Sequence, residues 1–278
     1  MNIEEDIEDI ETIFNINSLL MTLYYHIQNL SEEKRIELIF DMNSKLPRNL
    51  RGDPETLLHI LTEILTFIFH NSNKKEIVLS LISPEDFLYE EYISFKISPT
   101  SINKEKIMSL LETELAEDIE SLEGKIIYDQ DNNSDIHLSI PFKIMELGFR
   151  RHYRLPDKEM VGKKVLLICA KDKTAQSIKK MFEYFLYDVH TGFEEFEQYG
   201  NDLSAYDLLI ISEKIITEEF KKIIAEAQEN KALKYVLLEE PRTLNEDEAE
   251  SETKYFIKPI TQEKVFDLII SICDPKHR

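Results

Sequence analysis

The sequence predicts two domains: an α+β domain built on an antiparallel sheet, followed by a doubly wound α/β domain. Two observations lead to this fold class. The chain has 278 residues, and at roughly 100–200 residues per domain it is long enough for two separate cores. The order of predicted elements also changes near residue 162, from helices with paired strands to short strands that alternate with helices. We predict a first domain over residues 1–145, a polar linker over 146–162 and a second domain over 163–278.

Hydrophobic spacing predicts the elements of the first domain. Apolar residues at helical spacing over residues 4–30 predict two helices broken at 15–18, where Asn17 or Ser18 would cap the second. Asp53-Pro54-Glu55 combines an N-cap, an early proline and an acid, and predicts the start of a long helix that ends near Asn71. The other predicted elements are strands at 36–42, 77–83, 92–97, 125–129 and 136–141, and a helix over 102–122 that Gly124 ends. An antiparallel sheet with helices on one face is the expected result.

The second domain is predicted from short apolar runs separated by helical patterns. The predicted strands are 164–169, 188–191, 208–212, 235–239 and 255–257. The predicted helices are 175–185, 193–199, 218–230 and 262–272, with a weaker acidic helix or loop over 246–252. Five strands that alternate with helices favour a parallel sheet with helices on both faces.

Composition argues against two classes of partner. The chain is 42% hydrophobic and carries 54 acidic against 33 basic residues, for a net charge of −21. Nucleic acids and membrane surfaces attract proteins mainly through Lys and Arg, so neither partner is expected. The sequence shows no signal peptide and no apolar stretch long enough to span a bilayer, and we expect a cytoplasmic protein. Cys169 and Cys273 lie far apart and predict neither a disulfide framework nor a metal site.

Two groups of segments resemble bacterial hybrid sensor histidine kinases. Leu46–Pro54 and the helix after it look like the entry into the Asn-bearing helix of the ATP-binding domain, and Ser121–Ile126 with Ser139–Phe142 look like its closing strands. This part of the resemblance covers roughly Phe14 to Phe142. The segments 162–168, 206–211 and 255–260 look like strands of a receiver domain. The resemblance implies an α+β sandwich of the histidine-kinase ATPase type followed by a flavodoxin-like receiver domain.

The resemblance also implies that the ATP site is degenerate. The family positions of the two Asn residues fall at Glu63 and Phe67, and its Asp-x-Gly segment falls at Pro99 and Ser101. Glycines in such turns allow a positive φ and let the backbone approach a phosphate. No glycine occurs between Gly52 and Gly124. We therefore expect no nucleotide, other cofactor or metal ion in this domain.

The receiver-like half has lost its family chemistry in the same way. The acid pair that holds Mg²⁺ falls at Cys169 and Ala170, the acceptor Asp at Ser212, and the hydroxyl residue at Glu239. Of the family's functional residues, Lys258 is retained, together with Pro259 after it. A hard cation needs oxygen ligands, so we predict a pseudo-receiver that is not phosphorylated on Asp. Lys258 is expected to pair with a nearby acid such as Glu239.

Four further features have both a functional and an ordinary interpretation. His26 is a candidate phosphotransfer histidine, or an ordinary residue of a surface helix. The basic run from Arg150 and Arg151 to Arg154 would dock an acidic partner, or neutralise acidic groups of the chain itself. Tyr255 is a candidate partner contact, because family receivers signal through the face of their fourth and fifth strands. His59 and His70 share a helix face but have no third metal ligand nearby in sequence.

Both predicted domains keep the hydrophobic pattern of a core but lack the catalytic groups of the family. This combination predicts a binding protein rather than an enzyme. The first hypothesis is a non-catalytic pseudo-histidine kinase and pseudo-receiver that acts as a regulator or scaffold by binding a histidine kinase or a response regulator. The first alternative is a histidine phosphotransfer protein in a phosphorelay. The second alternative is an atypical ATP-binding histidine kinase fragment. The identity of the partner and the oligomeric state are left open by the sequence.

Overall fold

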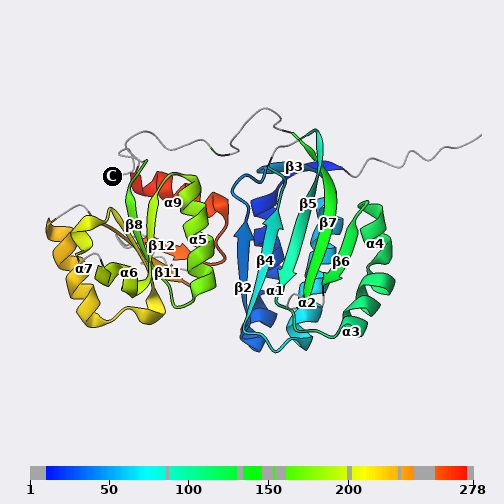
Figure 1. Cartoon of the computed structure of the whole chain (residues 1–278), viewed down its shortest axis with the longest axis horizontal. Helices are drawn as coiled ribbons and strands as arrows, with labels where there is room; N and C mark the ends of the chain where they lie inside the picture. Colours follow the sequence, from blue (N-terminus) through cyan, green and yellow to red (C-terminus); the bar gives the residue numbers. More distant parts are fainter. Residues whose placement is uncertain are drawn as a thin grey trace, which may run out of the picture. The chain divides into compact units, whose positions relative to one another are not determined.

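The structure is a computed structural model that divides into two compact units, Met1–His152 and Tyr153–Arg278 (Figure 1). It describes residues 11–85, 88–129, 134–145, 153, 161–198, 202–230, 233–240 and 254–273. Most of the predicted linker, including Arg150 and Arg151, lies outside these ranges, as does the predicted acidic element over 246–252. The two units are described separately below.

A seven-stranded sheet forms the centre of the N-terminal unit. The strands follow the order β1-β3-β7-β5-β4-β2, and β6 pairs with β7 beside β3. Their bounds are β1 (Thr12–Asn15), β2 (Glu37–Met42), β3 (Asn49–Gly52), β4 (Glu76–Ile82), β5 (Glu90–Ser98), β6 (Lys125–Asp129) and β7 (Asp135–Ile144). The prediction of a purely antiparallel sheet was wrong, because β2 and β4 pair in parallel. The chain passes through β3 and the helix α2 between these two strands, and such a crossover allows parallel neighbours.

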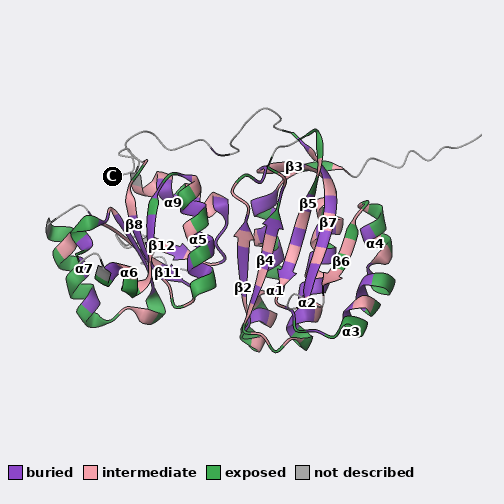
Figure 2. Ribbon diagram, viewed as in Figure 1, coloured by how far each residue is buried: buried purple, intermediate pink, exposed green. Residues whose placement is uncertain are grey.

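Helices cover one face of this sheet. They are α1 (Ile16–Lys34), α2 (Pro54–Asn71), α3 (Lys104–Ser109), the π-helical turn η1 (Leu110–Glu114) and α4 (Ala116–Ser121). Figure 1 shows α1 and α2 behind the strands. Buried and half-buried residues alternate along β4, β5 and β7 (Figure 2). Because successive side chains of a strand point to opposite faces, this alternation places the core between the sheet and the helices.

The predicted elements needed correction at the start of the chain. Residues 12–15 form the strand β1 instead of the predicted helix. The side chain of Asn15, rather than Asn17 or Ser18, caps α1 by accepting from the backbone N–H groups of those two residues at 2.8 Å and 3.4 Å. β1 pairs with β3, a strand that its sequence did not predict, and the ring centroids of Phe14 and Phe142 lie 5.8 Å apart. Strand pairing and ring contact therefore override the local helical spacing.

The C-terminal unit contains a five-stranded parallel sheet in the order β12-β11-β10-β8-β9. The strands are β8 (Lys164–Ile168), β9 (Asp188–Thr191), β10 (Leu208–Ser212), β11 (Lys234–Glu239) and β12 (Lys254–Ile257). The helices among the described residues are α5 (Asp172–Tyr184), α6 (Gly192–Gln198), α7 (Glu218–Asn230) and α9 (Gln262–Cys273), with short 3₁₀ turns η2 (Leu203–Ala205) and η3 (Glu213–Ile215). The predicted parallel alternation of strands and helices is confirmed, with bounds that differ by at most three residues.

Both faces of the parallel sheet are packed. One face presents Leu166, Leu209 and Ile211 to Phe196 of α6 and to the buried side of α7. On the other side, α5 and α9 contact each other, and the Gln262 amide donates to the Met181 carbonyl at 3.1 Å. The sheet is therefore doubly wound. In the part of the chain that the structure describes, no helix combines the length and the apolar character needed to cross a membrane.

Candidate functional site

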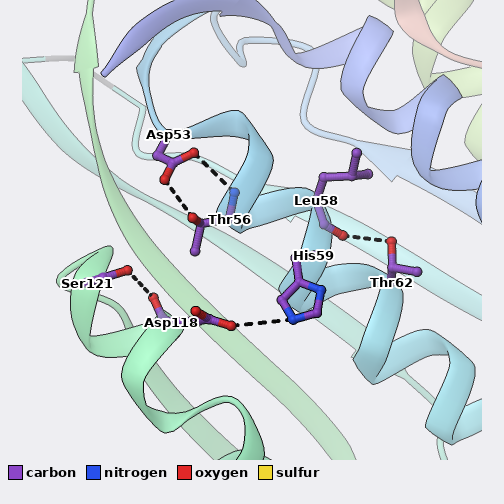
Figure 3. Close-up of polar contacts among 7 residues, drawn as sticks. All are labelled: Asp53, Thr56, Leu58, His59, Thr62, Asp118 and Ser121. Carbon is purple, nitrogen blue, oxygen red and sulfur yellow. Dashed lines mark hydrogen bonds and ion pairs between the residues drawn. The ribbon is translucent and has the colours of Figure 1, made fainter. Parts of the chain in front are cut away.

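The helix α2 carries the positions that the resemblance assigns to ATP binding, and its start is well defined. The Asp53 carboxylate accepts from the backbone N–H groups of Glu55 and Thr56 at 3.0 Å and 3.1 Å, and from the Thr56 hydroxyl at 2.6 Å (Figure 3). Pro54 occupies the first helical position. The predicted helix start is confirmed, and such a cap contributes about 1 kcal/mol to helix stability.

One stripe of α2 contains His59, Glu63 and Phe67, which are spaced four residues apart and so share a face of the helix. Glu63 and Phe67 are half-buried, and His59 is exposed. The opposite side of α2 supplies core residues such as Leu61 and Ile64, which are fully buried. The amphipathic pattern of α2 therefore places the two family Asn positions away from the centre of the core.

A polar contact joins this stripe to α4. The His59 Nε2 atom lies 3.5 Å from the Asp118 Oδ2 atom, and Figure 3 shows the two side chains pointing toward each other. The side chains are 55% and 38% exposed. Solvent screens a pair of this kind, so its contribution is at most about 1 kcal/mol. The pair is a tether between two helices that lie far apart in the sequence, and no local signal in the sequence predicts it.

The segment after β5 contains Pro99 and Ser101, to which the resemblance assigns the family's Asp-x-Gly motif. The Ser98–Pro99 peptide is cis, and Ser101 has a φ of 54°. The buried Thr100 donates its hydroxyl to the Ser134 carbonyl. A positive φ is the conformation that glycine accepts without strain. Ser101 thus adopts a glycine-like backbone conformation while it carries a side chain.

Residues 104–121 form the helical segment α3-η1-α4, and the resemblance places a nucleotide lid in this part of the chain. The segment is not the plain helix that was predicted, because η1 interrupts it with a bond from the Leu115 N–H to the Leu110 carbonyl, five residues back, at 3.0 Å. The side chains that face the core are buried: Ile107, Leu110, Leu111, Leu115 and Ile119. Leu110, Leu111 and Leu115 are all buried across the π turn. This segment is held by apolar packing of its own side chains.

The second candidate site lies at the carboxyl ends of the parallel strands, which meet at one edge of the sheet. Cys169 and Ala170 follow β8, Ser212 ends β10 and Glu239 ends β11. Cys169 is half-buried and Ala170 is exposed. Ser212 and Glu239 are buried. The topology thus brings the predicted positions to a common edge, as expected for a sheet of this order.

Lys258 follows β12 at the same edge and is paired with an acid. Its Nζ atom lies 3.2 Å from the Glu240 Oε1 atom, and the Lys214 Nζ atom lies 2.9 Å from the same oxygen. The expected acid was Glu239, the preceding residue, whose carbonyl accepts from the Lys258 backbone N–H at 3.0 Å. Lys258 therefore belongs to an ion cluster that also contains Lys214 and Glu240, neither of which was predicted.

Lys264 supports the loop that carries Lys258. Its ammonium donates to the Ile257 and Pro259 carbonyls at 2.9 Å each, on both sides of Lys258. Burial lowers the pKa of Lys264 to about 8. Pro259 is buried, and the Lys258–Pro259 peptide is cis. Lys264 stands six residues after Lys258 on the next helix, and the sequence contains no signal that links the two.

The remaining candidate residues are dispersed. His26 is exposed on α1 beside the exposed Tyr25, and His70 is exposed at the end of α2. Tyr255 is half-buried on β12, opposite Leu237 of β11. Among the residues that the structure describes, no group of three or more His, Cys, Asp or Glu side chains is placed to hold a metal ion.

Comparison with known proteins gives structural matches. No protein-family model matches the sequence, and no curated protein matches it either. The full-length protein ShkA, solved in complex with AMPPNP, matches 97% of this chain with a TM-score of 0.65 and 13% identity. This chain spans 58% of the ShkA chain. The likeness to ShkA extends over nearly the whole sequence and supports a histidine-kinase-like fold.

Two histidine kinases match about half of the chain. AdeS from Acinetobacter baumannii matches 49% of this chain and 68% of its own, with a TM-score of 0.38 and 11% identity. The nucleotide-free catalytic domain of ThkA matches 48% of this chain and 96% of its own, with a TM-score of 0.37 and 18% identity.

Proposed function

We propose that the chain is a non-catalytic two-component signalling protein, a pseudo-histidine kinase joined to a pseudo-receiver, which acts by binding histidine kinases or response regulators. The observation that carries the proposal is the chemistry at Ser101. The backbone there has the left-handed conformation that suits a glycine, with a φ of 54°. Serine carries a β-carbon, so this backbone lacks the open approach that a glycine would give to a phosphate. On this proposal, the turn keeps the left-handed backbone of the family but has a serine in place of the glycine that nucleotide binding requires.

The other positions of the ATP-like site support the same conclusion. Phe67 offers no oxygen to a magnesium ion, which binds oxygen ligands. Pro99 offers no side-chain acceptor for an adenine amine. The residues of the lid position are packed into the core by apolar side chains such as Ile107 and Leu115.

The C-terminal unit supports the pseudo-receiver part of the proposal. Its strand order, β9-β8-β10-β11-β12, is the flavodoxin-like order, in which ligands bind at the carboxyl ends of the strands. At that edge Cys169 and Ala170 offer no pair of carboxylates to a cation, and Ser212 offers a hydroxyl where an acceptor carboxylate is needed. Lys258 is paired with Glu240. An ion pair within the protein replaces the contact that a phosphoryl group would make.

Titration of Mg²⁺ and ATP into the purified full chain tests the central claim. We expect no saturable heat at protein concentrations high enough to detect weak binding. A Ser101→Gly variant is the matched control. We expect that it also fails to bind ATP, because Phe67 and Pro99 are unchanged. Saturable binding with micromolar affinity to the unaltered chain would contradict the proposal and favour an atypical ATP-binding kinase fragment.

A second experiment tests the receiver-like half and the partners. Incubation with Mg²⁺ and acetyl phosphate should leave the intact mass of the chain unchanged. The immobilised chain should then retain one member of a panel of histidine kinases and response regulators, and Tyr255→Ala should weaken that binding without changing the circular dichroism spectrum. Failure to retain any member of the panel would count against the partner assignment.

The exposure of His26 favours one alternative, a histidine phosphotransfer protein. In that case an active kinase or phosphorylated receiver would transfer phosphate to the chain, and the product would be acid-labile. His26→Gln would abolish the transfer, and His70→Gln is a control because His70 is also exposed on a helix. Absence of transfer to the unaltered chain would remove this alternative.

A further inference from the structure

Two large apolar side chains of the C-terminal unit lie exposed on the helices α6 and α7. Phe193 of α6 is 42% exposed and Ile223 of α7 is 38% exposed. The Phe193 ring packs edge-on against the ring of Phe220, with 5.7 Å between the centroids. Phe220 and Ile223 stand three residues apart on α7, a spacing that makes them neighbours on the helix surface. Both exposed side chains therefore lie beside Phe220, and Figure 2 shows exposed positions along both helices.

Buried rings support this exposed pair. Phe196 and Phe220 are buried, and their rings pack edge-on with 6.0 Å between the centroids. Both belong to the core cluster that contains Leu209 and Ile211 of β10. Phe193 rests on a ring that is fixed in this core, so a partner that covers Phe193 has little to order when it binds. An aromatic side chain held in this way is suited to anchor an interface.

Acidic side chains border the exposed pair. Glu194 and Glu197 follow Phe193 on α6, and Glu219 stands one helical turn before Ile223 on α7; all three are exposed. None of these carboxylates makes an ion pair or a hydrogen bond with another residue that the structure describes. These five residues are called the α6–α7 patch below. The patch combines apolar side chains with carboxylates that have no cation beside them in the described chain.

Other charged groups of the two helices are used within the chain or point elsewhere. The Glu195 carboxylate accepts from the Thr191 backbone N–H. The Lys221 ammonium lies 2.7 Å from a carboxylate oxygen of Glu218. Lys222 points about 100° away from Ile223 around α7, because an α-helix has 3.6 residues per turn. The cations of α7 therefore leave the carboxylates of the patch available to a partner.

The charge of the patch selects the class of partner. Nucleic acids and membrane surfaces are anionic and are repelled by unpaired carboxylates. A complementary protein surface presents apolar side chains bordered by Lys or Arg. A basic amphipathic helix has this pattern, because apolar residues at i, i+3, i+4 and i+7 form one stripe and cations occupy the positions beside it.

We propose that the α6–α7 patch is a docking surface for a basic amphipathic helix of a partner protein. Phe193 and Ile223 contact the apolar stripe of that helix, and Glu194, Glu197 and Glu219 pair with its flanking cations. The patch contains none of the positions that the resemblance assigns to ATP or phosphate chemistry. The docking surface therefore does not depend on the state of either candidate site, and its failure would leave the nucleotide test of the proposed function unaffected.

A designed peptide tests the proposal on the full chain. The probe is a fluorescein-labelled peptide of about 18 residues, long enough to form a helix, with leucine at the stripe positions and lysine beside them. A matched peptide has serine in place of the leucines and the same charge. Fluorescence anisotropy should show that the leucine peptide binds at least about tenfold more tightly than the serine peptide. Equal affinities would mean charge attraction alone, and these or a lack of binding by the leucine peptide would overturn the proposal.

Variants at exposed positions test the apolar anchors. The double variant Phe193→Ser with Ile223→Ser should weaken binding of the leucine peptide by at least about tenfold. Leu186→Ser is the matched control, because Leu186 is a 44% exposed apolar side chain of the same unit outside the patch. It should change the affinity by less than about twofold, and both chains should keep the circular dichroism spectrum of the unaltered chain. Equal binding to the double variant and to Leu186→Ser would contradict the placement of the anchors.

The carboxylates are tested separately. Glu197→Gln with Glu219→Gln should weaken binding and reduce its dependence on salt, because exposed charges are screened by ions. Glu229→Gln is the control: Glu229 is exposed on α7 nine residues from Phe220, which places it on the opposite side of the helix. If Glu229→Gln and the double variant had the same effect, the acidic border would have no specific role and the proposal would fail.

Hydrogen exchange of the unaltered chain locates the contact without any variant. Saturation with the leucine peptide should slow amide exchange in α6 and α7 and leave exchange in α5 and α9 unchanged. Slower exchange in α5 and α9, with α6 and α7 unaffected, would place the peptide elsewhere and overturn the proposal.

Discussion

Replacement of Gly124 by alanine should destabilise the N-terminal unit by about 1–2 kcal/mol. Gly124 follows α4, and its N–H donates to the Ile119 carbonyl at 2.8 Å. A β-carbon at this position would lie 2.9 Å from that carbonyl oxygen and 3.1 Å from the Ile119 Cγ2 atom. The carbonyl oxygen belongs to the backbone of α4, so it cannot move away as the end of a flexible side chain can.

Two opposing effects decide the magnitude. Exchange of glycine for alanine restricts the unfolded chain and stabilises the fold by about 0.4–1 kcal/mol where the new side chain fits. Overpacking costs about 1–3 kcal/mol. Since the Ile119 oxygen also accepts the Gly124 hydrogen bond, relief of the contact weakens the end of α4. The steric cost is therefore expected to exceed the gain from the unfolded state.

Urea unfolding of the full chain, followed by circular dichroism, measures this effect, and Glu123→Gly is the matched control. Glu123 has a φ of 51°, and its N–H donates to the Glu120 carbonyl at 2.9 Å, which together with the Gly124 bond forms a Schellman motif. Glycine at this left-handed position should stabilise the unit by about 0.5–1 kcal/mol. A Gly124→Ala midpoint at or above that of the unaltered chain, with the slope unchanged, would refute the steric argument.

Three further predictions follow from other contacts. Asp53→Ala should cost the N-terminal unit about 1 kcal/mol by removing the α2 cap, whereas Asp53→Asn should cost only a small part of that in the same urea assay. A double-mutant cycle of His59→Ala and Asp118→Ala should give a coupling energy below about 1 kcal/mol, and a larger value would mean that the pair is shielded from solvent. The pKa of Lys264 is about 8 in the folded chain against an ordinary 10.5. Between these two pH values the amine of Lys264 is protonated in the unfolded chain but largely neutral in the folded chain. Stability of the C-terminal unit should therefore rise between pH 8 and pH 10, and a Lys264→Met chain that shows the same rise would refute the assignment.

The helices were predictable where local chemistry defines both ends. Asp53 and Pro54 start α2 in the structure as the sequence predicts, because an N-cap acid and an early proline act within one turn of the chain. The strands of the C-terminal unit were predictable for a related reason. Runs such as Leu208–Ile211, which is buried at every position, are apolar throughout because the strand is covered on both faces.

The errors in the first domain have one physical cause. Ile13 and Phe14 fit a helical repeat with the residues before them, yet they form β1, because β3 offers it hydrogen bonds and Phe142 offers a ring. β3 itself has one buried apolar residue, Leu50, and no strand signal of its own. β3 lies between β1 and β7 and pairs with both, and pairing of this kind cannot be read from any one of the segments alone.

The candidate sites divide in the same way. The resemblance assigned family positions to residues such as Phe67, Ser101 and Ser212, since motifs are read along the chain. It did not locate the partners of the residues that remain. The Lys258–Glu240 pair, the His59–Asp118 pair and the Tyr153–Tyr184 ring contact join residues that are 18, 59 and 31 positions apart.

The sequence by itself determined which segments are helices and strands where the hydrophobic period and the caps agree, and it supplied the resemblance from which the proposed function starts. These properties depend on a few neighbouring residues. The tertiary structure alone decided the parallel pairing of β2 with β4, the glycine-like backbone of Ser101 and the burial of Tyr153. Those features depend on where distant elements pack, because a strand edge, a left-handed residue or an aromatic ring is stabilised by neighbours that the fold brings to it.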